Sequence, residues 1–393
     1  MKYIFDKTSN RKNTHSCKWD AFDGDLPMWV ADMDFIVLPE IQKAIEERNN
    51  IGAFGYTLVP DEYYQSYKLW WKKHHSVDLD TKDMIFCIGV IAGLDSILKH
   101  LVPSGSGAII QTPVYHVFGH CILNNDLKVV ENPLIYENHE YRIDFDNLEK
   151  LLKEENNKAF LLCNPHNPVG KIWSKDDLSR IAELCLKYDV LLISDEIHCD
   201  ITKPGSSYNS IFSVTNNAIA LLSPSKAFNI AGVQAACIVC PNKDKYEVIS
   251  KGVGMDDVGE PNFFSPFAAI AAYTYGDEWI KEMNEYIFEN KKYIDEFIKR
   301  ELPKAHLIDN DATYLLWLDL SSYVKDITAF TEKLRKETGL ILSPGKQFGE
   351  NGEGFVRINI ATKKANVIDA CSRLLNFLKQ LTKGKVACIV GPK

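Results

Sequence analysis

Long apolar runs, internal repeats and low-complexity stretches are all missing from this 393-residue sequence. No stretch of about 20 apolar residues could cross a bilayer, and the first residues, Met1–Thr8, lack the apolar core of a secretory signal. Without a repeat of about 20–50 residues, solenoid and propeller folds are excluded. We therefore expect a globular, cytoplasmic protein with no membrane partner.

An excess of positive charge is missing as well. The chain has 45 Lys and Arg residues against 53 Asp and Glu residues, which gives a formal net charge of −8. A balance of this sign favours neither nucleic acid nor an anionic membrane as a partner. Hydrophobic residues make up 46% of the chain and charged residues 25%, which is typical of a globular protein.

The ten cysteines are scattered and form neither a disulfide framework nor a zinc-ligand pattern. Cys237 and Cys240 form a C-x-x-C pair, but a strand would point their side chains to opposite faces. His198 and Asp200 could be interpreted as metal ligands, although no third ligand accompanies them at a suitable spacing. We therefore predict no metal site and expect the cysteines to be mostly small core residues.

Short apolar segments alternate with amphipathic ones through the middle of the chain. Segments of this length and composition are typical of strands buried on both faces, and they are Ala108–Ile110, Ala159–Cys163, Val190–Ile193, Ala218–Leu222 and Ala236–Val239. Between two of them, Ser174 and Asp177 have the spacing of a capping box, followed by apolar residues at helical spacing. The alternation predicts an α/β domain with a largely parallel sheet.

The last hundred residues have a different pattern, which favours a smaller α+β domain. A long polar helix is expected at about 279–301 and is followed by a strand at 314–318, a helix at about 326–338, a Gly-rich stretch at 344–354, a strand at 355–360 and a final helix. Residues 383–393 have no assigned role and are expected to form a loosely held tail. A chain of this length suits two domains, one large and one small.

Three polar motifs each follow an apolar segment, at the position where open α/β sheets bind ligands. They are Asn164–Gly170 (NPHNPVG), Ser194–Asp200 (SDEIHCD) and Leu222–Gly232 (LSPSKAFNIAG). Taken singly, each has an ordinary explanation: a strand-to-helix turn, a helix cap or ion pair, and a solvated surface lysine. Taken together, they supply an amide, a carboxylate that can hold a ring nitrogen protonated, and a lysine that can form a Schiff base.

In this order the motifs resemble those of a known family. N-P-x-N-P-x-G, D-E-I-H, S-x-S-K-x-F-N-x-A-G and a late R-I-N are similar to the motifs of fold-type I pyridoxal-phosphate enzymes, in the class I/II aminotransferase branch. Within it, Met28–Phe35 (MWVADMDF) and Phe54–Thr57 (FGYT) resemble the MalY/PatB group of cystathionine β-lyases, which are carbon–sulfur lyases. The resemblance implies a large domain at residues 48–285 with a mostly parallel seven-stranded sheet. Residues 1–47 and 286–393 would form the small domain.

The resemblance implies pyridoxal 5′-phosphate as the cofactor and gives the motif residues their roles. Lys226 would hold the cofactor as a Schiff base and, once substrate displaces it, take the α-proton. Asp195 would pair with the pyridinium nitrogen, Asn167 would bond the phenolic oxygen beside the substrate, and Tyr115 would stack on the ring. Tyr115 could instead be a core residue. His198 stands where many aminotransferases carry a tyrosine, so its role stays open.

The same resemblance implies where the phosphate and a second subunit would lie. Val90 and Ile91 belong to the turn that opens a helix after Gly89, and backbone N–H groups at such a turn bind phosphate. Many relatives have P-G-V at this turn, where this chain has I-G-V. Ser223 and Ser225 would add their hydroxyls. Tyr56 would reach the phosphate from a second subunit, which implies a homodimer with shared active sites.

The substrate implied is a small amino acid. Arg357 would clamp its α-carboxylate through a bidentate pair that lysine cannot reproduce, although a structural salt bridge is the alternative explanation for this arginine. Trp29 and the backbone of Ala31–Asp34 would line the substrate entrance.

Two reactions remain open for these residues, because both begin with removal of the α-proton. Expulsion of a β-thiolate would release a thiol, pyruvate and ammonia, whereas reprotonation on the cofactor would lead to transamination. The similarity of Met28–Phe35 to the MalY/PatB group favours β-elimination from L-cystathionine or another cysteine S-conjugate. Aminotransferase activity is the alternative. A binding or regulatory protein is disfavoured, because Lys226 and Arg357 are both present.

Overall fold

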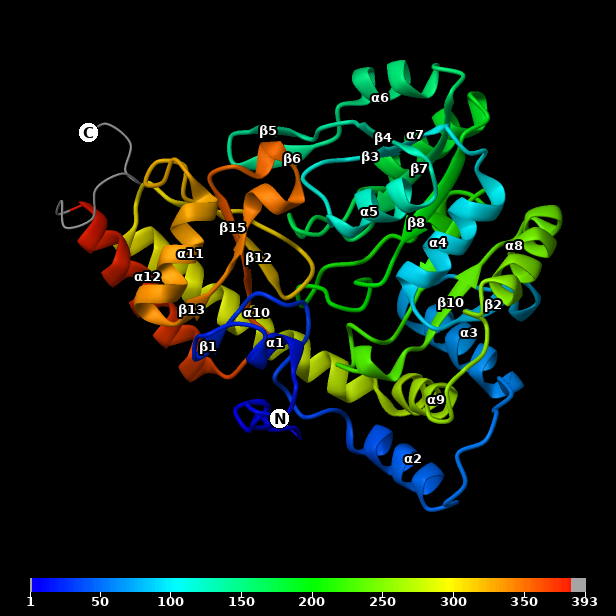
Figure 1. The fold of residues 1–393 in the computed structure, drawn as a ribbon, viewed down its shortest axis with the longest axis horizontal. Coiled ribbons are helices and arrows are strands. Elements are labelled where there is room, and N and C mark those ends of the chain that lie inside the picture. Colours follow the sequence, from blue (N-terminus) through cyan, green and yellow to red (C-terminus); the bar gives the residue numbers. More distant parts are fainter. Residues whose placement is uncertain (1, 383–393) are drawn as a thin grey trace.

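The computed structural model describes residues 2–382 as a seven-stranded and a four-stranded sheet surrounded by helices (Figure 1). The larger sheet has the strand order β2-β10-β9-β8-β7-β3-β4. β10 runs antiparallel to both neighbours, and the other pairs are parallel. Its strands are β2 (Met84–Cys87), β3 (Gly107–Ile110), β4 (Lys128–Glu131), β7 (Asn157–Cys163), β8 (Leu191–Asp195), β9 (Ile219–Leu222) and β10 (Ala236–Val239). The expected mostly parallel, seven-stranded sheet is confirmed.

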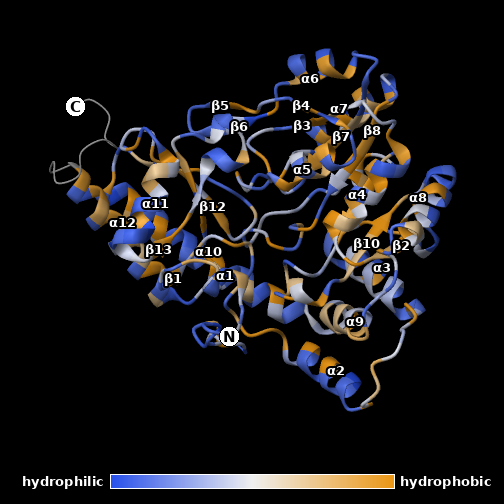
Figure 2. Ribbon diagram, in the orientation of Figure 1, coloured by the Kyte–Doolittle hydropathy of each residue, from blue (hydrophilic) through white to orange (hydrophobic). Residues whose placement is uncertain are grey.

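Helices cover both faces of the larger sheet. One face packs against α4 (Val90–Leu101), α5 (Val117–Asn124) and α8 (Lys243–Met255), and the other against α3 (Asp61–His75), α6 (Phe145–Leu152), α7 (Lys175–Lys187) and α9 (Ser265–Tyr275). Along β7, Leu161 and Cys163 join the first core, while Phe160 and Leu162 join the second. Because both faces are buried, the inner strands are largely apolar, whereas the edge strand β4 has exposed Lys128 and Glu131 at its ends (Figure 2).

The smaller sheet is antiparallel and lies beside the larger one (Figure 1). Its order is β11-β12-β15-β14, with strands β11 (His306–Leu307), β12 (Leu315–Asp319), β14 (Ser343–Pro344) and β15 (Phe355–Asn359). Around it lie α10 (Asp277–Glu301), α11 (Ile327–Thr338) and α12 (Lys364–Thr382). A separate hairpin joins β5 (Ile135–Glu137) to β6 (Glu140–Arg142). Five short 3-10 turns complete the fold, at Thr81–Asp83, Ile211–Ser213, Ala231–Val233, Gly345–Phe348 and Glu350–Gly352.

The N-terminal segment is tied to the smaller sheet and then crosses to the larger one. After α1 (Cys17–Asp20), β1 (Leu26–Pro27) pairs in parallel with β13 (Leu340–Ile341). Asn359 then bonds the carbonyls of Val30 and Asp32, and Asn229 bonds those of Met33 and Phe35. Residues 29–35 therefore bridge the two sheets. α2 (Pro39–Asn49) and an exposed connection at 50–60 lead on to α3.

The elements expected from the sequence form within a few residues of their predicted bounds. All five apolar segments are strands, and Ser174 with Asp177 forms a capping box at the start of α7. Cys237 and Cys240 join opposite cores, as expected. The Gly-rich stretch forms β14 and two 3-10 turns, and the expected tail at 383–393 lies outside the described residues. No helix among residues 2–382 has the length and apolarity that a bilayer crossing requires.

The turn after β7 is held against the loop before β12 by close backbone approach at Gly170. The Gly170 carbonyl accepts hydrogen bonds from the N–H groups of Asp311, at 3.1 Å, and Ala312, at 3.0 Å. Gly170 has a φ of +70°, a conformation that favours glycine. A Cβ here would overlap the Asn310 side chain and lie 2.8 Å from the Ala312 carbonyl oxygen. Only glycine therefore allows this contact between the two sheet regions.

We predict that Gly170→Ala lowers the free energy of unfolding by about 2 kcal/mol or more, because backbone strain and overlap add. Gly105→Ala is the matched control, since Gly105 has a φ of +82° and nothing within 4 Å of its Cβ position. It should cost only about 1 kcal/mol. Chemical denaturation of both variants measures the difference, and equal losses would contradict the packing role.

Candidate active site

The polar motifs meet at the carboxyl-terminal edge of the larger sheet. β7, β8 and β9 are adjacent and parallel, with Cys163 opposite Asp195 and Asp195 opposite Leu221. The segments that follow β7 and β9, which carry Asn167 and Lys226, therefore begin at the same edge as Asp195. α4 begins at this edge too. It packs closely against β9, since a Cβ at Gly93 would lie only 3.1 Å from the Leu221 side chain.

Lys226 lies half-buried between this edge and the N-terminal segment. Its Nζ donates a hydrogen bond to the Ala31 carbonyl at 2.7 Å, and the Tyr314 hydroxyl donates to the same oxygen at 3.1 Å. Burial lowers the pKa of Lys226 to about 8, an effect that Asp32 and Asp195 oppose and Arg357 reinforces. A neutral amine is therefore accessible near physiological pH, as a nucleophile or general base requires.

Asp195 ends β8 as a buried carboxylate that lacks a cationic partner at ion-pair distance among the described residues. Its Oδ1 accepts a hydrogen bond from the Ile197 N–H at 3.0 Å. Burial raises the pKa of Asp195 to about 7. Such a carboxylate is stabilised in its charged form by a bound cation, so this position fits a protonated ring nitrogen.

Arg357 is a buried cation without an acidic partner within 4 Å among residues 2–382. Nη1 donates to Asn167 Oδ1 at 3.2 Å and Nη2 donates to the Trp29 carbonyl at 2.8 Å, while Nε has no partner in the described part of the chain. The guanidinium lies 4.7 Å from the centre of the Phe348 ring. Burial lowers the pKa of Arg357 to about 10. An unpaired buried guanidinium of this kind fits a carboxylate ligand, and the expected alternative, a structural salt bridge, is not formed.

The charge of Arg357 shifts the pKa values of both His198 and Tyr115. Burial, reinforced by Lys226 and Arg357, lowers the pKa of His198 to about 3, so its imidazole is neutral. His198 Nδ1 is buried without a partner among the described residues, which leaves it available to a ligand. Tyr115 is half-buried, and burial raises the pKa of its phenol, with Arg357 and Asp195 also acting on it.

The expected phosphate position is formed by α4 and the turn after β9. Gly89 is the N-cap of α4, and no side chain among the described residues caps the N–H groups that begin with Val90 and Ile91. Ser223 donates to the Ala235 carbonyl at 2.7 Å and lies 2.8 Å from the Ser225 hydroxyl. Ser223 therefore holds the turn, and free backbone donors at a helix N-terminus suit an anion.

The side chains of two expected site residues, Trp29 and Tyr56, make no hydrogen bond to the other site residues within residues 2–382. Trp29 contributes its backbone carbonyl to Arg357, whereas its indole N–H bonds the Lys18 carbonyl at 3.1 Å. Tyr56 is fully exposed, with a relative exposure of 102%, in the connection between α2 and α3. Within one chain, therefore, Tyr56 is not part of the site.

The structure adds residues that the sequence did not identify. The Tyr314 hydroxyl bonds the carbonyl that accepts from Lys226, and Phe348 lies against Arg357. Asp32, whose backbone was expected at the substrate entrance, also acts on Lys226 through the charge of its carboxylate. Tyr314 stands at the start of the apolar run 314–318, and nothing in that pattern signals a role at the site. Together the residues offer a carboxylate for a cation, a guanidinium for an anion, and free N–H groups for a phosphate. Pyridoxal phosphate with an amino-acid substrate fits this combination of charges.

Comparisons with known proteins agree with this geometry. The model of the family Aminotransferase class I and II matches residues 30–374. Cystathionine beta-lyase PatB from Bacillus subtilis is 35% identical, over 94% of this chain and 98% of PatB. The crystal structure of cystalysin from Treponema denticola, which contains a pyridoxal 5′-phosphate cofactor, has a TM-score of 0.93 and 33% identity, over 97% of this chain and all of cystalysin. The PLP-bound C-S lyase from Staphylococcus hominis has a TM-score of 0.90 and 34% identity, over 96% and 99% of the two chains.

We predict that Lys226→Met changes how the stability of the cofactor-free protein depends on pH. The pKa of Lys226 is about 8 in the folded chain against an ordinary value of 10.5, so between these values the unfolded chain binds the extra proton. Stability from this group therefore rises with pH from 8 to 10.5. Between pH 8 and 10.5 the free energy of unfolding of the unmodified protein should rise by up to about 3 kcal/mol relative to that of Lys226→Met.

Urea denaturation at several pH values from 7 to 11 measures this difference. Lys43→Met is the control, because Lys43 is an exposed lysine on α2. A constant difference between Lys226→Met and the unmodified protein would rule out a desolvated amine at this position.

Proposed function

The chain belongs to the aminotransferase class I and II family, and on that premise we propose that it is a carbon–sulfur β-lyase that acts on L-cystathionine or related cysteine S-conjugates. Pyridoxal 5′-phosphate is its cofactor, as the motifs predicted. The fold is that of the fold-type I pyridoxal-phosphate enzymes, also as predicted. The choice of reaction and the role of each residue are what we propose.

The residues around Lys226 are suited to hold the cofactor. Lys226 would bind it covalently, Asp195 would keep its ring nitrogen protonated, and the N-terminus of α4 would receive its phosphate. Asn167 and His198 would contact its polar edge, and Tyr115 would pack on its ring. When bound, pyridoxal phosphate supplies a carbonyl that joins the substrate amine and a protonated ring that accepts electrons from the α-carbon.

Arg357 would bind and orient the substrate. Its free Nε N–H and its two terminal nitrogens offer the fork of donors that matches a carboxylate. The Asn167 amide and the Trp29 carbonyl hold the guanidinium plane from two directions, so its orientation is set before substrate arrives. A carboxylate bound there would hold the α-carbon of an amino acid near Lys226, which feels the charge of Arg357.

Lys226 would then take the α-proton, since burial leaves its amine partly neutral near pH 7 to 8. The electron pair of the Cα–H bond forms a Cα–Cβ double bond while the Cβ–S bond breaks. The sulfur leaves as a thiolate and takes up a proton to become the thiol. Water hydrolyses the remaining unsaturated amine to pyruvate and ammonia, so atoms and charges balance without an oxidant or a keto acid.

The observation that carries the choice of reaction is the contact between the N-terminal segment and Lys226. Residues Met28–Phe35 are the part of the sequence that resembles carbon–sulfur lyases, and the Ala31 carbonyl within them accepts the hydrogen bond of the Lys226 amine. The segment therefore lies where it can affect the fate of the substrate after proton removal. Similarity to cystathionine beta-lyase PatB and to the Staphylococcus hominis C-S lyase supports elimination over transamination.

We predict that the purified holoenzyme releases thiol and pyruvate continuously from L-cystathionine without any added keto acid. Elimination regenerates the cofactor in each cycle, whereas transamination stops after one turnover unless a keto acid restores it. A thiol reagent and a coupled lactate dehydrogenase assay follow the two products. Turnover that begins only when 2-oxoglutarate or pyruvate is added would replace the lyase with an aminotransferase.

Lys226→Ala and Lys99→Ala are a matched pair for this assay. Lys99 is an exposed lysine on α4, paired with Asp256, so its loss should leave turnover intact. Loss of Lys226 should abolish both turnover and the covalent trapping of cofactor by borohydride. Trapping on another lysine would remove the proposed role of Lys226.

We further propose that the protein is a homodimer in which Tyr56 completes the partner's site. The connection between α2 and α3 leaves four large apolar side chains exposed, namely Ile51, Phe54, Tyr56 and Leu58. Phe54 lies 5.5 Å from the ring of Phe263, which anchors the base of this connection to its own chain. A row of exposed apolar side chains is typical of a surface that another chain covers.

Mixed dimers test this arrangement. Co-expression of Tyr56→Phe and Lys226→Ala chains with different tags should give hybrids with one intact site, because the active Lys226 then faces an intact Tyr56. Their activity should exceed that of either homodimer. Hybrids no more active than the Tyr56→Phe homodimer would place Tyr56 outside the partner's site.

A further inference from the structure

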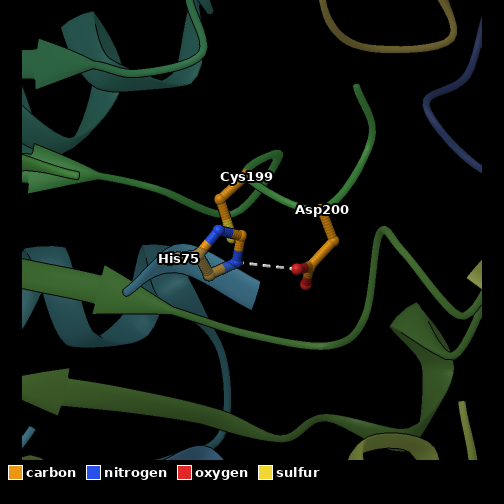
Figure 3. Close-up of side chains that lie close together, drawn as sticks. All are labelled: His75, Cys199 and Asp200. Atoms are coloured by element: carbon orange, nitrogen blue, oxygen red, sulfur yellow. Dashed lines mark hydrogen bonds and ion pairs between the residues drawn. The ribbon is translucent and has the colours of Figure 1, made fainter. Parts of the chain in front are cut away.

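A second cluster of chemically reactive side chains lies apart from the site around Lys226. His75 is the last residue of α3, and Cys199 and Asp200 follow His198 in the loop after β8 (Figure 3). One potential ligand atom from each of the three lies within 4.8 Å of the other two. His75 and Asp200 are 125 residues apart in sequence, so the fold alone creates this group.

The cluster contains buried atoms that the protein does not satisfy. His75 Nε2 lies 2.8 Å from Asp200 Oδ1, which also accepts a hydrogen bond from the Trp70 indole N–H at 2.8 Å. Asp200 Oδ2 and His75 Nδ1 are buried without a partner among the described residues. Asp200 is more than nine-tenths buried. An unpaired carboxylate oxygen at this depth carries a desolvation cost that a bound cation would offset.

The helix end and the carboxylates next to the three side chains favour positive charge, while Lys73, Lys175 and Lys281 line the outer part of the cavity. His75 stands at the carboxyl-terminal end of a 15-residue helix, where the backbone dipole is negative. Cys199 is buried, and its burial, together with the neighbouring Asp200 and Glu196, raises the pKa of its thiol well above the ordinary value. A metal ion reverses that effect, because it binds the thiolate directly.

We propose that His75, Cys199 and Asp200 form a binding site for a zinc-like divalent cation, separate from the pyridoxal-phosphate site. Imidazole, thiolate and carboxylate are ligands that zinc accepts at about 2.0–2.3 Å. Ligands of one tetrahedral ion lie about 3.3–3.8 Å apart, so the present spacing of the three atoms needs only small side-chain movements. No metal site was predicted from the sequence, because His198 and Asp200 have no third ligand at a suitable spacing along the chain.

A fourth ligand and a route from solvent are both available. Asn284 on α10 donates to the Asp200 carbonyl at 2.9 Å, and its own Oδ1 is buried without a partner in the described part of the chain. An open cavity of about 680 Å³, lined by all four residues, adjoins the cluster. Water or the Asn284 amide oxygen can therefore complete a tetrahedral set.

A cation bound to these three residues would stabilise the fold and would not contact the substrate. Cys199 is the residue after His198, whose ring faces the Lys226 environment. A cation that joins the end of α3 to Cys199 and Asp200 would hold the loop that carries His198. Its loss should therefore lower thermal stability without removing the cofactor.

Cobalt binding to the chelator-treated holoenzyme tests the proposal. Co²⁺ should bind with a stoichiometry of one per chain and give a near-ultraviolet thiolate-to-metal charge-transfer band, and Zn²⁺ should displace it and raise the melting temperature. Cys199→Ala should abolish the band and the stabilisation. His75→Gln should weaken both. The cofactor absorbance and far-ultraviolet circular dichroism of each variant establish that it is folded.

Two control variants distinguish this cluster from ordinary buried thiols and ion pairs. Cys185→Ala removes an equally buried cysteine on α7. His100→Gln removes a histidine that lies 2.9 Å from Asp256, the same kind of pair without a thiol. Both controls should keep the cobalt band. The absence of stoichiometric cobalt binding to the unmodified protein, or a band that survives in Cys199→Ala, would overturn the proposal whatever reaction the enzyme catalyses.

Discussion

Lys226, Asp195 and Arg357 are desolvated without an ion pair to one another among the described residues, and this constraint shapes the rest of the molecule. Burial lowers the pKa of Lys226 to about 8 and that of Arg357 to about 10, and it raises that of Asp195 to about 7. Each group is therefore held in an environment that opposes its charge. A ligand that brings a cation to Asp195 and an anion to Arg357 relieves both costs, and the cofactor with an amino-acid substrate has these charges.

Such an arrangement is stable only if the backbone holds the three side chains firmly. Asp195 ends a strand that is paired on both sides, and Arg357 stands in the middle of β15, between β12 and β14. The N-terminal segment closes the space between the two sheets, where the Ala31 and Trp29 carbonyls accept from Lys226 and Arg357. Neutral carbonyls satisfy the donors without neutralising their charge. The site is thus organised while its charges remain available to a ligand.

Much of the fold could be predicted from the sequence, for identifiable reasons. Strands buried on both faces are apolar throughout, so β7, β8 and β9 could be located, and the polar residues that follow them had to share one sheet edge. Tyr314 and Phe348 were missed, since they come from the start of an apolar run and from a 3-10 turn, neither of which marks a ligand site. The pairing of His75 with Cys199 and Asp200 was missed for the same reason, because His75 ends a helix more than a hundred residues earlier.

The sequence by itself determined the cofactor class, the family and the strands that carry the motifs, because these depend on residue types at short spacings. Only the tertiary structure decided which side chains are buried without partners, since desolvation depends on every element packed around a group. Among residues 2–382 it left Arg357 without a salt bridge, bound the Lys226 amine to a carbonyl almost 200 residues away in the chain, and left Tyr56 fully exposed. These properties arise from contacts between distant segments, and no local pattern in the chain encodes them.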